Sequence, residues 1–303
     1  MALLYALEQL RHPVLDEIML LVTRFGEETA FLVTALVVFW CVDKRKGYYL
    51  MAVGFAGTLL NQFLKLWFRI PRPWVLDPEF TIVEKARAAA TGYSFPSGHS
   101  TSAVGTFGAL AAATRNPGMR RVCIAVAVLV PVSRMYLGVH TPLDVMVGSG
   151  LALLLVFLLL PMLGQNGEKV MQFALVTTLV MALGLLVFVE RYPFPENMDP
   201  HNLESGIKNA YTMLGSIAGA VLVCWLEPKY VKFETKASWW GQVLKILLGL
   251  GTVLAIKEGL RAPLEMVLPV YPARAVRYFL IVIWAGIGWP KCFPILTKMG
   301  VKK

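Results

Sequence analysis

The sequence predicts an all-α, polytopic helical membrane protein, and three observations lead to this prediction. The 303 residues are 57% hydrophobic and only 16% charged, and the mean hydropathy is +0.62, more than the core of a soluble domain needs. Apolar runs long enough to cross a bilayer recur along the chain. These runs are continuous rather than alternating, and backbone in lipid must satisfy its own hydrogen bonds, so helices are expected and a barrel is not.

About nine transmembrane helices are expected, with boundaries good to a few residues. The segment before them, Met1 to Gly26, mixes apolar and charged residues and lacks the clean apolar core of a signal peptide. We therefore expect an amphipathic segment in the membrane interface there. The predicted spans are 28–42, 47–69, 98–114, 120–137, 143–163, 169–189, 207–226, 242–259 and 275–292.

The chain is predicted to divide near residue 164. Residues 1–163 comprise the interfacial segment and five spans and contain every candidate site residue. Residues 164–303 add about four spans, for which the sequence predicts no role.

The net charge of +10 would also suit a nucleic-acid-binding protein, but the chain has no basic helix or aromatic-interleaved basic stripe. Its cations cluster in short loops between apolar runs, as is typical of membrane proteins. The four cysteines show no metal-type or redox-type spacing, so buried free thiols are expected. They are Cys41, Cys123, Cys224 and Cys292.

The basic loop clusters predict the orientation. Lys44 to Lys46 and Arg115 to Arg121 are expected in the cytoplasm, although three arginines near the C-terminus (Arg261, Arg274 and Arg277) count against this orientation. With it, the ends of spans two and four and the starts of spans three and five face the extracytoplasmic side. All the polar groups discussed next lie at those ends.

Arg72 lies between Pro71 and Pro73, whose fixed φ angles stiffen the turn and stop the preceding helix. A planar guanidinium on a stiff turn is preorganised for bidentate contact with a phosphate. Lys65, one or two turns earlier, adds a point charge. For Lys65 taken alone, snorkelling at the membrane interface is an equally good interpretation.

The tetrapeptide Pro96-Ser97-Gly98-His99 reads as a helix start, with Ser97 as the N-cap. Gly98 lets the backbone approach a ligand closely, and free N–H groups at a helix start favour an anion. An ordinary helix cap is an equally good interpretation of this tetrapeptide alone.

Thr141 and Pro142 predict another helix start, which places His140 just before a helix and Asp144 within about one turn. An imidazole held by a carboxylate keeps a defined tautomer and becomes a better nucleophile or base. His99 is then placed to protonate a leaving alkoxide.

Metal binding is the competing use of His99, His140 and Asp144. No further ligands at suitable spacing are present, and three cations in one site would repel a divalent metal. We therefore expect neither a metal nor another cofactor.

Together these motifs are similar to those of the type 2 phosphatidic acid phosphatase (PAP2) superfamily. The similarity covers about residues 30–163 and includes Arg134, which lies between Ser133 and the His140 motif. It implies a metal-independent, two-step mechanism in a PAP2-type helical core. In that mechanism His140 forms a phosphohistidine oriented by Asp144, and His99 protonates the leaving group. The implied phosphate ligands are Lys65, Arg72, Ser97, Gly98 and Arg134.

The function expected from residues and resemblance is hydrolysis of a lipid phosphate or diphosphate, of the phosphatidic acid, prenyl pyrophosphate or sphingoid-phosphate type. The expected setting is the bacterial cytoplasmic membrane, with the site facing outward. Two alternatives stay open: a phosphatase for a soluble sugar phosphate, and a transporter that binds phosphate lipids without cleaving them. A binder needs the cations but does not need two histidines with an orienting carboxylate. The oligomeric state is open, and a homodimer is compatible with the sequence.

Overall fold

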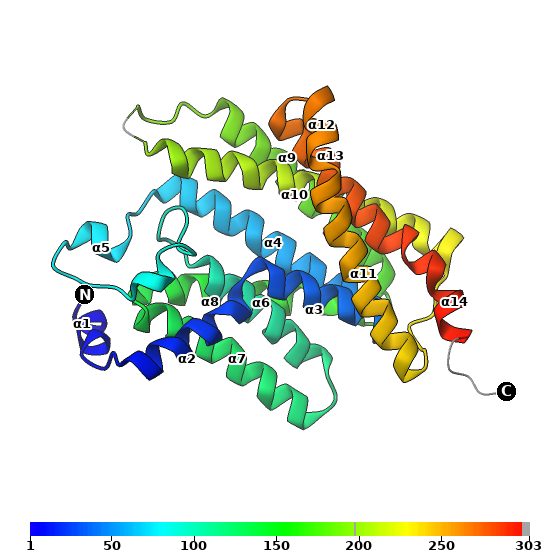
Figure 1. The fold of residues 1–303 in the computed structure, drawn as a ribbon, viewed down its shortest axis with the longest axis horizontal. Helices are drawn as coiled ribbons and strands as arrows, with labels where there is room; N and C mark the ends of the chain where they lie inside the picture. Colours follow the sequence, from blue (N-terminus) through cyan, green and yellow to red (C-terminus); the bar gives the residue numbers. More distant parts are fainter. Residues whose placement is uncertain (197, 299–303) are drawn as a thin grey trace. The chain divides into compact units, whose positions relative to one another are not determined.

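The computed structural model describes residues 1–196 and 198–298, and every regular element in them is helical (Figure 1). The all-α prediction is therefore confirmed, and each of the predicted apolar segments overlaps a helix. These helices are α3 (Glu28–Cys41), α4 (Lys44–Phe68), α6 (Gly98–Ala113), α7 (Pro117–Tyr136), α8 (Pro142–Leu159), α9 (Gly167–Arg191), α10 (Pro200–Leu226), α11 (Trp239–Gly259) and α13 (Val270–Ile283).

Short helices and single turns connect these long elements. The short helices are α1 (Ala2–Glu8), α2 (Pro13–Thr23), α5 (Pro73–Leu76), α12 (Arg261–Val267) and α14 (Phe293–Lys298). The turns are η1 (Arg24–Gly26), η2 (Glu84–Ala86), η3 (Leu160–Leu163), η4 (Glu227–Val231), η5 (Trp284–Gly288) and η6 (Pro290–Cys292).

Four continuous helical segments of the described residues are long and apolar enough to cross a membrane, judged by length and composition. They are Pro142–Leu163, Gly167–Arg191, Pro200–Val231 and Val270–Leu296. The count of about nine spans stays a prediction.

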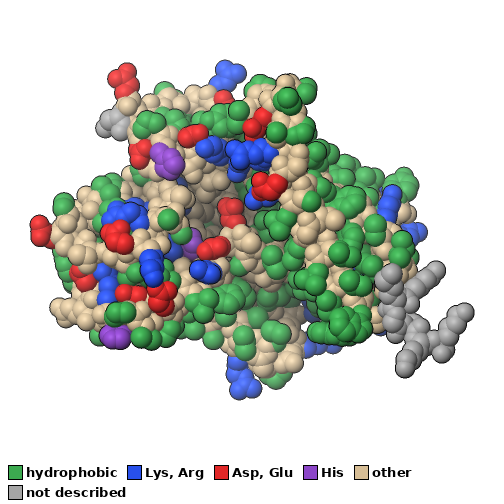
Figure 2. Space-filling model, in the orientation of Figure 1, with side chains coloured by type: hydrophobic (Ala, Val, Ile, Leu, Met, Phe, Trp, Pro, Cys, Tyr) green, Lys and Arg blue, Asp and Glu red, His purple; other side chains and the backbone are tan. Residues whose placement is uncertain are grey.

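Large apolar side chains are exposed on several helices, and hydrophobic atoms cover much of the visible surface (Figure 2). Phe157 on α8 and Phe173 on α9 are 65% and 74% exposed. Exposed apolar surface on this scale is unfavourable in water and favourable in lipid. The surface therefore agrees with helices that face hydrocarbon.

The predicted interfacial segment folds into α1 and α2. On α2 and the turn after it, Val14, Ile18, Leu21 and Phe25 are all exposed. Their spacing puts them on one side of a helix, while α2 also packs against α7. This exposed apolar stripe fits a helix that lies along a membrane surface.

The chain forms two compact units that interleave along the sequence. The first comprises Met1–Leu32, Val53–Leu160 and Phe194–Gly206. The second comprises Val33–Ala52, Pro161–Pro193 and Ile207–Lys303. Every candidate site residue belongs to the first unit.

In the first unit, α6 packs against both α7 and α8. Its sequence is rich in Gly, Ala, Ser and Thr, and small residues let neighbouring helices approach closely. The second half of α4 joins this group through Asn61, whose Nδ2 donates to Thr101 Oγ1 on α6 at 3.1 Å. The result is a bundle whose helix ends carry the polar motifs.

In the second unit, α10 and α13 touch backbone to backbone, since a Cβ at Gly215 would come within 2.0 Å of the Ala275 carbonyl oxygen. Lys44 Nζ and Glu227 Oε1 form an ion pair at 2.6 Å.

The cysteines are free, as predicted, but Cys41 and Cys292 are only partly buried.

Candidate active site

The structure brings the predicted site residues of the three motifs together at one end of the first unit's bundle. Lys65 comes from the end of α4, Arg72 from the residue before α5, and Arg134 from the last turn of α7. Charge interactions couple these three cations and His99 to His140. Residues from five helix ends therefore share one buried site.

His140 lies between α7 and α8 and is 1% exposed. Its Nε2 is 2.9 Å from Nη1 of Arg72. Because a guanidinium can only donate, Nε2 must accept this hydrogen bond through its lone pair. The ring proton of a neutral His140 is therefore on Nδ1.

The surroundings keep this imidazole neutral. Burial lowers the pKa of His140 well below its usual value, and Arg72, Arg134, Lys65 and His99 lower it further. At neutral pH the Nε2 lone pair is consequently not protonated, which is the state that a nucleophile or base requires.

Asp144 sits in the first turn of α8, where the predicted helix start is confirmed. Thr141 caps the helix through a reciprocal pair of bonds: Thr141 N donates to Asp144 Oδ2 at 2.7 Å, and Asp144 N donates to Thr141 Oγ1 at 3.2 Å. Asp144 Oδ2 is 3.5 Å from His140 Nδ1, which is too long for a good hydrogen bond.

Ser94 lies between this carboxylate and the imidazole, and motif reasoning missed it. Its hydroxyl donates to Asp144 Oδ2 at 2.6 Å, and the same oxygen is 3.4 Å from His140 Nδ1. Ser94 Oγ can thus accept a hydrogen bond from Nδ1–H of His140 while its hydroxyl donates to Asp144. No spacing rule marks a loop serine 46 residues from His140 for this role.

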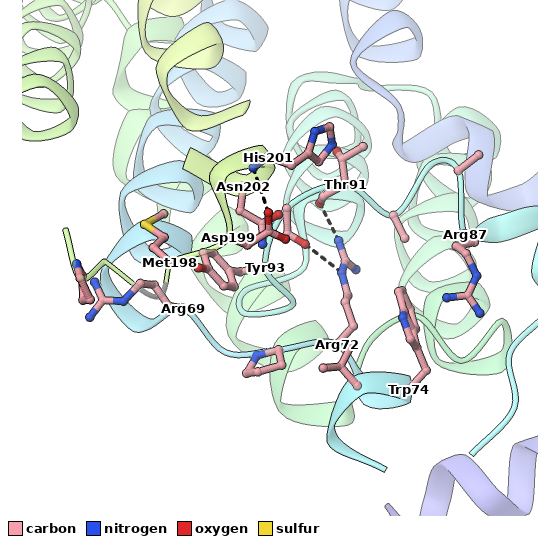
Figure 3. Close-up of a pocket in the computed structure, with 16 residues that line it drawn as sticks. Arg69, Arg72, Trp74, Arg87, Thr91, Tyr93, Met198, Asp199, His201 and Asn202 are labelled. Atoms are coloured by element: carbon pink, nitrogen blue, oxygen red, sulfur yellow. Dashed lines mark hydrogen bonds between the residues drawn. The ribbon is translucent and has the colours of Figure 1, made fainter. Parts of the chain in front are cut away.

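Arg72 is held by backbone carbonyls (Figure 3). Its Nε donates to Gly92 O at 3.1 Å and its Nη2 to Thr91 O at 2.7 Å. Nη1 donates to Val139 O at 2.9 Å. Burial lowers the pKa of Arg72 to about 10, opposed by Asp144, so the guanidinium stays charged at neutral pH. The stiff turn predicted from the flanking prolines thus presents a fixed cation to His140.

Lys65 turns into the site rather than toward the interface. It is 8% exposed, and its ammonium donates to the Tyr93 carbonyl oxygen. The snorkelling interpretation of Lys65 is therefore wrong, since a snorkelling ammonium would reach solvent.

The Ser97 turn is held from two sides. Ser97 caps α6 by accepting from Ser100 N at 3.4 Å, as predicted, and its own N–H donates to Asp144 O at 3.0 Å. From α4, Asn61 Nδ2 donates to Pro96 O at 3.2 Å. The third contact is with Gly148 of α8, where a Cβ would come within 2.7 Å of Ser97 O.

Three buried nitrogen atoms at the site have no hydrogen-bond partner within the described part of the chain. They are Nε2 of His99 and both Nε and Nη2 of Arg134, while Nη1 of Arg134 donates to Thr23 Oγ1 at 2.9 Å. Unpaired buried donors are rare in folded proteins and indicate a missing partner. An anion with several acceptor oxygens, such as a phosphate, would satisfy them.

The described residues contain no group of three or more His, Cys, Asp or Glu side chains placed to hold a metal ion. Metal independence stays a prediction, because the reaction itself has to be tested for it.

Comparisons with known proteins agree with the motif resemblance. The family model of the PAP2 superfamily matches residues 45–168, and a second model, described as a PAP2 superfamily phosphatase transmembrane extension, matches residues 211–300. No solved structure matches the chain.

Similar proteins are named as phosphatases. Phosphatidylglycerophosphatase B of Bacillus subtilis is 32% identical over 163 residues, which is 49% of this chain and 75% of the relative. Undecaprenyl-diphosphatase BcrC of the same organism is 31% identical, over 48% of this chain and 73% of the relative. An undecaprenyl-diphosphatase of Sulfolobus acidocaldarius is 32% identical, over 44% of this chain and 64% of the relative.

We predict that Ser94→Ala lowers kcat for phosphate-ester hydrolysis about tenfold, the effect of losing one hydrogen bond to a charged group. KM should change little, because Ser94 orients the imidazole and does not contact the phosphate. Steady-state kinetics of the purified chain in detergent measure both constants. Ser149→Ala is the matched control, since that buried hydroxyl has no partner in the described residues. Equal kcat for Ser94→Ala and the wild type would exclude this role.

Proposed function

Because this chain belongs to the PAP2 superfamily, we propose that it hydrolyses a lipid phosphate or diphosphate through a covalent phosphohistidine on His140. One observation carries the proposal: the Nε2 lone pair of His140 lies within a cluster of cations. Arg134 and His99, which carry unpaired buried nitrogens, are among the residues whose charges act on this imidazole. A nucleophile, phosphate-binding donors and a proton donor are then available together.

In the proposed first step, a bound phosphate takes over the Arg72 N–H that now occupies His140 Nε2. The Nε2 lone pair attacks phosphorus, the bond to the ester oxygen breaks, and His99 in its protonated form supplies the proton that the leaving alkoxide needs. The Nδ1 proton of His140 is stabilised by Ser94 and Asp144 as positive charge develops on the ring.

In the second step, water attacks the phosphohistidine, the N–P bond breaks, and inorganic phosphate leaves. His99, now neutral, accepts a proton from the attacking water. During both transfers negative charge is spread over the equatorial oxygens, where Lys65, Arg72, Arg134 and the N–H groups of the Ser97–Gly98 turn bind them. The cations do the electrostatic work that a metal ion does in other phosphatases.

The substrate class follows from the setting and from the relatives. The chain is an integral membrane protein, and the matched relatives are named for a phosphatidylglycerol phosphate and for undecaprenyl diphosphate. We propose that the lipid tail stays in the bilayer while the phosphate enters the polar site. A soluble sugar phosphate is the runner-up substrate, and lipid-phosphate transport without cleavage is the alternative from a different class.

We propose about nine transmembrane helices, with the site on the extracytoplasmic side of a bacterial cytoplasmic membrane. The basic clusters at Lys44–Lys46 and Arg115–Arg121 support this orientation. In this arrangement residues 1–163 hold the catalytic groups and residues 164–303 form a C-terminal membrane region. The proposal is compatible with a monomer or a homodimer.

The purified chain in detergent should release inorganic phosphate from a panel of lipid phosphates and diphosphates, with millimolar EDTA present. Lipid substrates should be hydrolysed faster than glucose 6-phosphate under the same conditions. Faster turnover of the sugar phosphate would favour the runner-up, and no turnover of either would favour the transporter. Loss of activity in EDTA that magnesium or zinc restores would contradict the metal-independent mechanism.

Substitutions of the two histidines should affect turnover in different ways. His140→Ala should abolish both product and the alkali-stable phosphoenzyme seen on rapid quench into base. His99→Ala should lower turnover of an alkyl phosphate by about 10²–10⁴-fold, the usual contribution of general acid catalysis, but lower turnover of p-nitrophenyl phosphate less. Substantial turnover by His140→Ala would show that another group is the nucleophile.

The orientation can be tested by labelling. A cysteine introduced as Ala89→Cys, in the loop that precedes the Ser97 turn, should react with an impermeant maleimide in intact cells. Asn116→Cys, in the loop between α6 and α7, should react only after permeabilisation, and the parent chain serves as the blank. The reverse pattern would place the site in the cytoplasm.

A further inference from the structure

A side-chain hydrogen bond that reaches far across the sequence holds Arg134. Its Nη1 donates to Thr23 Oγ1 at 2.9 Å, and the two residues are 111 positions apart. Both are buried, since Thr23 is 5% exposed and Arg134 is 0% exposed. Backbone carbonyls hold the neighbouring cation Arg72 instead. The direction of the Arg134 guanidinium therefore depends on a side chain of the N-terminal segment.

The bond to Thr23 leaves one edge of this guanidinium without a partner. Nε and Nη2 of Arg134 are buried and have no hydrogen-bond partner among the described residues. These two groups lie on the same edge of a guanidinium, so their N–H bonds can reach two oxygens of one phosphate. Because the group is planar and rigid, a bond that holds Nη1 also sets the direction of this edge.

Thr23 is placed by a well-packed helix. It is the last residue of α2, which packs against α7, the helix that carries Arg134 (Figure 1). Two apolar side chains of α2, Leu15 and Met19, pack against the buried cluster that includes Leu137. Both helices belong to the compact unit that contains the site. Packing outside the site therefore fixes the Thr23 hydroxyl.

Tyr136, two residues after Arg134, joins α7 to the N-terminal segment by polar contacts. Its hydroxyl donates to Asp16 Oδ1 on α2 at 2.6 Å and accepts from His12 N at 3.2 Å. Its backbone carbonyl accepts from Arg11 Nε at 3.1 Å. The N-terminal segment thus holds α7 close to the position of Arg134.

The turn after α2 also reaches His99. At Gly26 in η1, a Cβ would lie 2.8 Å from the His99 carbonyl oxygen and 2.9 Å from Val130 Cγ1 on α7. Glycine allows this close approach because it has no Cβ. Residues 23–26 therefore contact both α6 and α7, the two helices whose side chains bring unpaired buried nitrogen atoms to the site.

We propose that Thr23 is a positioning residue, which holds Nη1 of Arg134 and thereby directs Nε and Nη2 toward the substrate phosphate. The inference rests on the proposed function and gives the N-terminal segment, which carries no motif residue, a part in the site. Thr23 itself does not contact the reacting atoms. Its effect passes through Arg134, because donors that are already oriented stabilise a transferring phosphoryl group without reorganising.

The test compares Thr23→Val with Thr23→Ser in the full chain, purified in detergent. Valine keeps the branched shape but has no acceptor oxygen. Thr23→Val should therefore raise the dissociation constant for inorganic phosphate about tenfold, the effect of losing one hydrogen bond to a charged group. The value of kcat/KM for a lipid phosphate should fall by the same factor. Thr23→Ser keeps the oxygen and should match the wild type in both measurements.

Phosphate affinity is measured from the ligand-induced shift in unfolding temperature, which does not depend on turnover. Thr106→Val is the matched control, because it makes the same change at a buried hydroxyl of α6 that has no partner in the described residues. This control should change neither constant. Thr23→Ala removes the same oxygen as Thr23→Val and should reproduce its losses, so a folding defect in one variant does not decide the result.

A second background separates positioning of Arg134 from a general loosening of α2. Arg134→Lys has no guanidinium edge to direct, so adding Thr23→Val to it should cause no further loss of phosphate affinity. A loss as large as in the wild-type background would overturn the inference.

Unchanged phosphate affinity in folded Thr23→Val or Thr23→Ala would also overturn it, as would an equal loss in Thr106→Val. If phosphate binding follows the expected pattern but the wild type hydrolyses no lipid phosphate, the proposed function fails and the positioning inference stands. If the wild type hydrolyses lipid phosphates and Thr23→Val matches it in both constants, the inference fails and the proposed function stands.

Discussion

The hydrogen bond between Arg72 and His140 is the interaction on which the rest of the site depends. A guanidinium has no acceptor, so the bond requires the lone pair of His140 to be on Nε2 and the ring proton on Nδ1. The proton on Nδ1 then has to meet an acceptor, which Ser94 and Asp144 provide. This one contact therefore fixes the tautomer of the imidazole. The tautomer in turn sets the direction of the hydrogen bonds that run from the cation through the imidazole to the carboxylate.

The charge balance of the site explains why it suits an anion. Lys65, Arg72 and Arg134 are each at most 8% exposed, and the carboxylate of Asp144 is engaged by Thr141 and Ser94. Buried cations without counter-charges are costly, and carbonyl oxygens compensate only part of that cost for Arg72 and Lys65. A doubly charged phosphate would supply the remaining charge, so the energy that disfavours the empty cluster becomes binding energy for the substrate.

Much of this arrangement could be predicted from the sequence, because the motifs mark helix ends. A helix end is determined by residues that are close together in the sequence. Ser97 and Thr141 cap the helices at which they were expected, and continuous apolar runs marked the long helices. The inward turn of Lys65 could not be predicted, since it depends on a carbonyl 28 residues away. Ser94 was missed for the same reason: its partners, His140 and Asp144, come from another element, and no spacing rule connects them.

One segment after residue 164 belongs to the compact unit that carries the motifs. A boundary near residue 164 separates the motifs from the rest of the sequence, yet Phe194–Gly206 packs in the unit that carries the motifs. The matched family regions, 45–168 and 211–300, leave this segment between them. It is thus a connection between two recognisable parts, and its residues Asp199 and Asn202 line the same cavity as Thr91–Tyr93. Connections of this kind vary more than the elements they join and often carry function. Because this one lines the same cavity as Arg72, variation in it would change the surroundings of a predicted phosphate ligand without altering any motif residue.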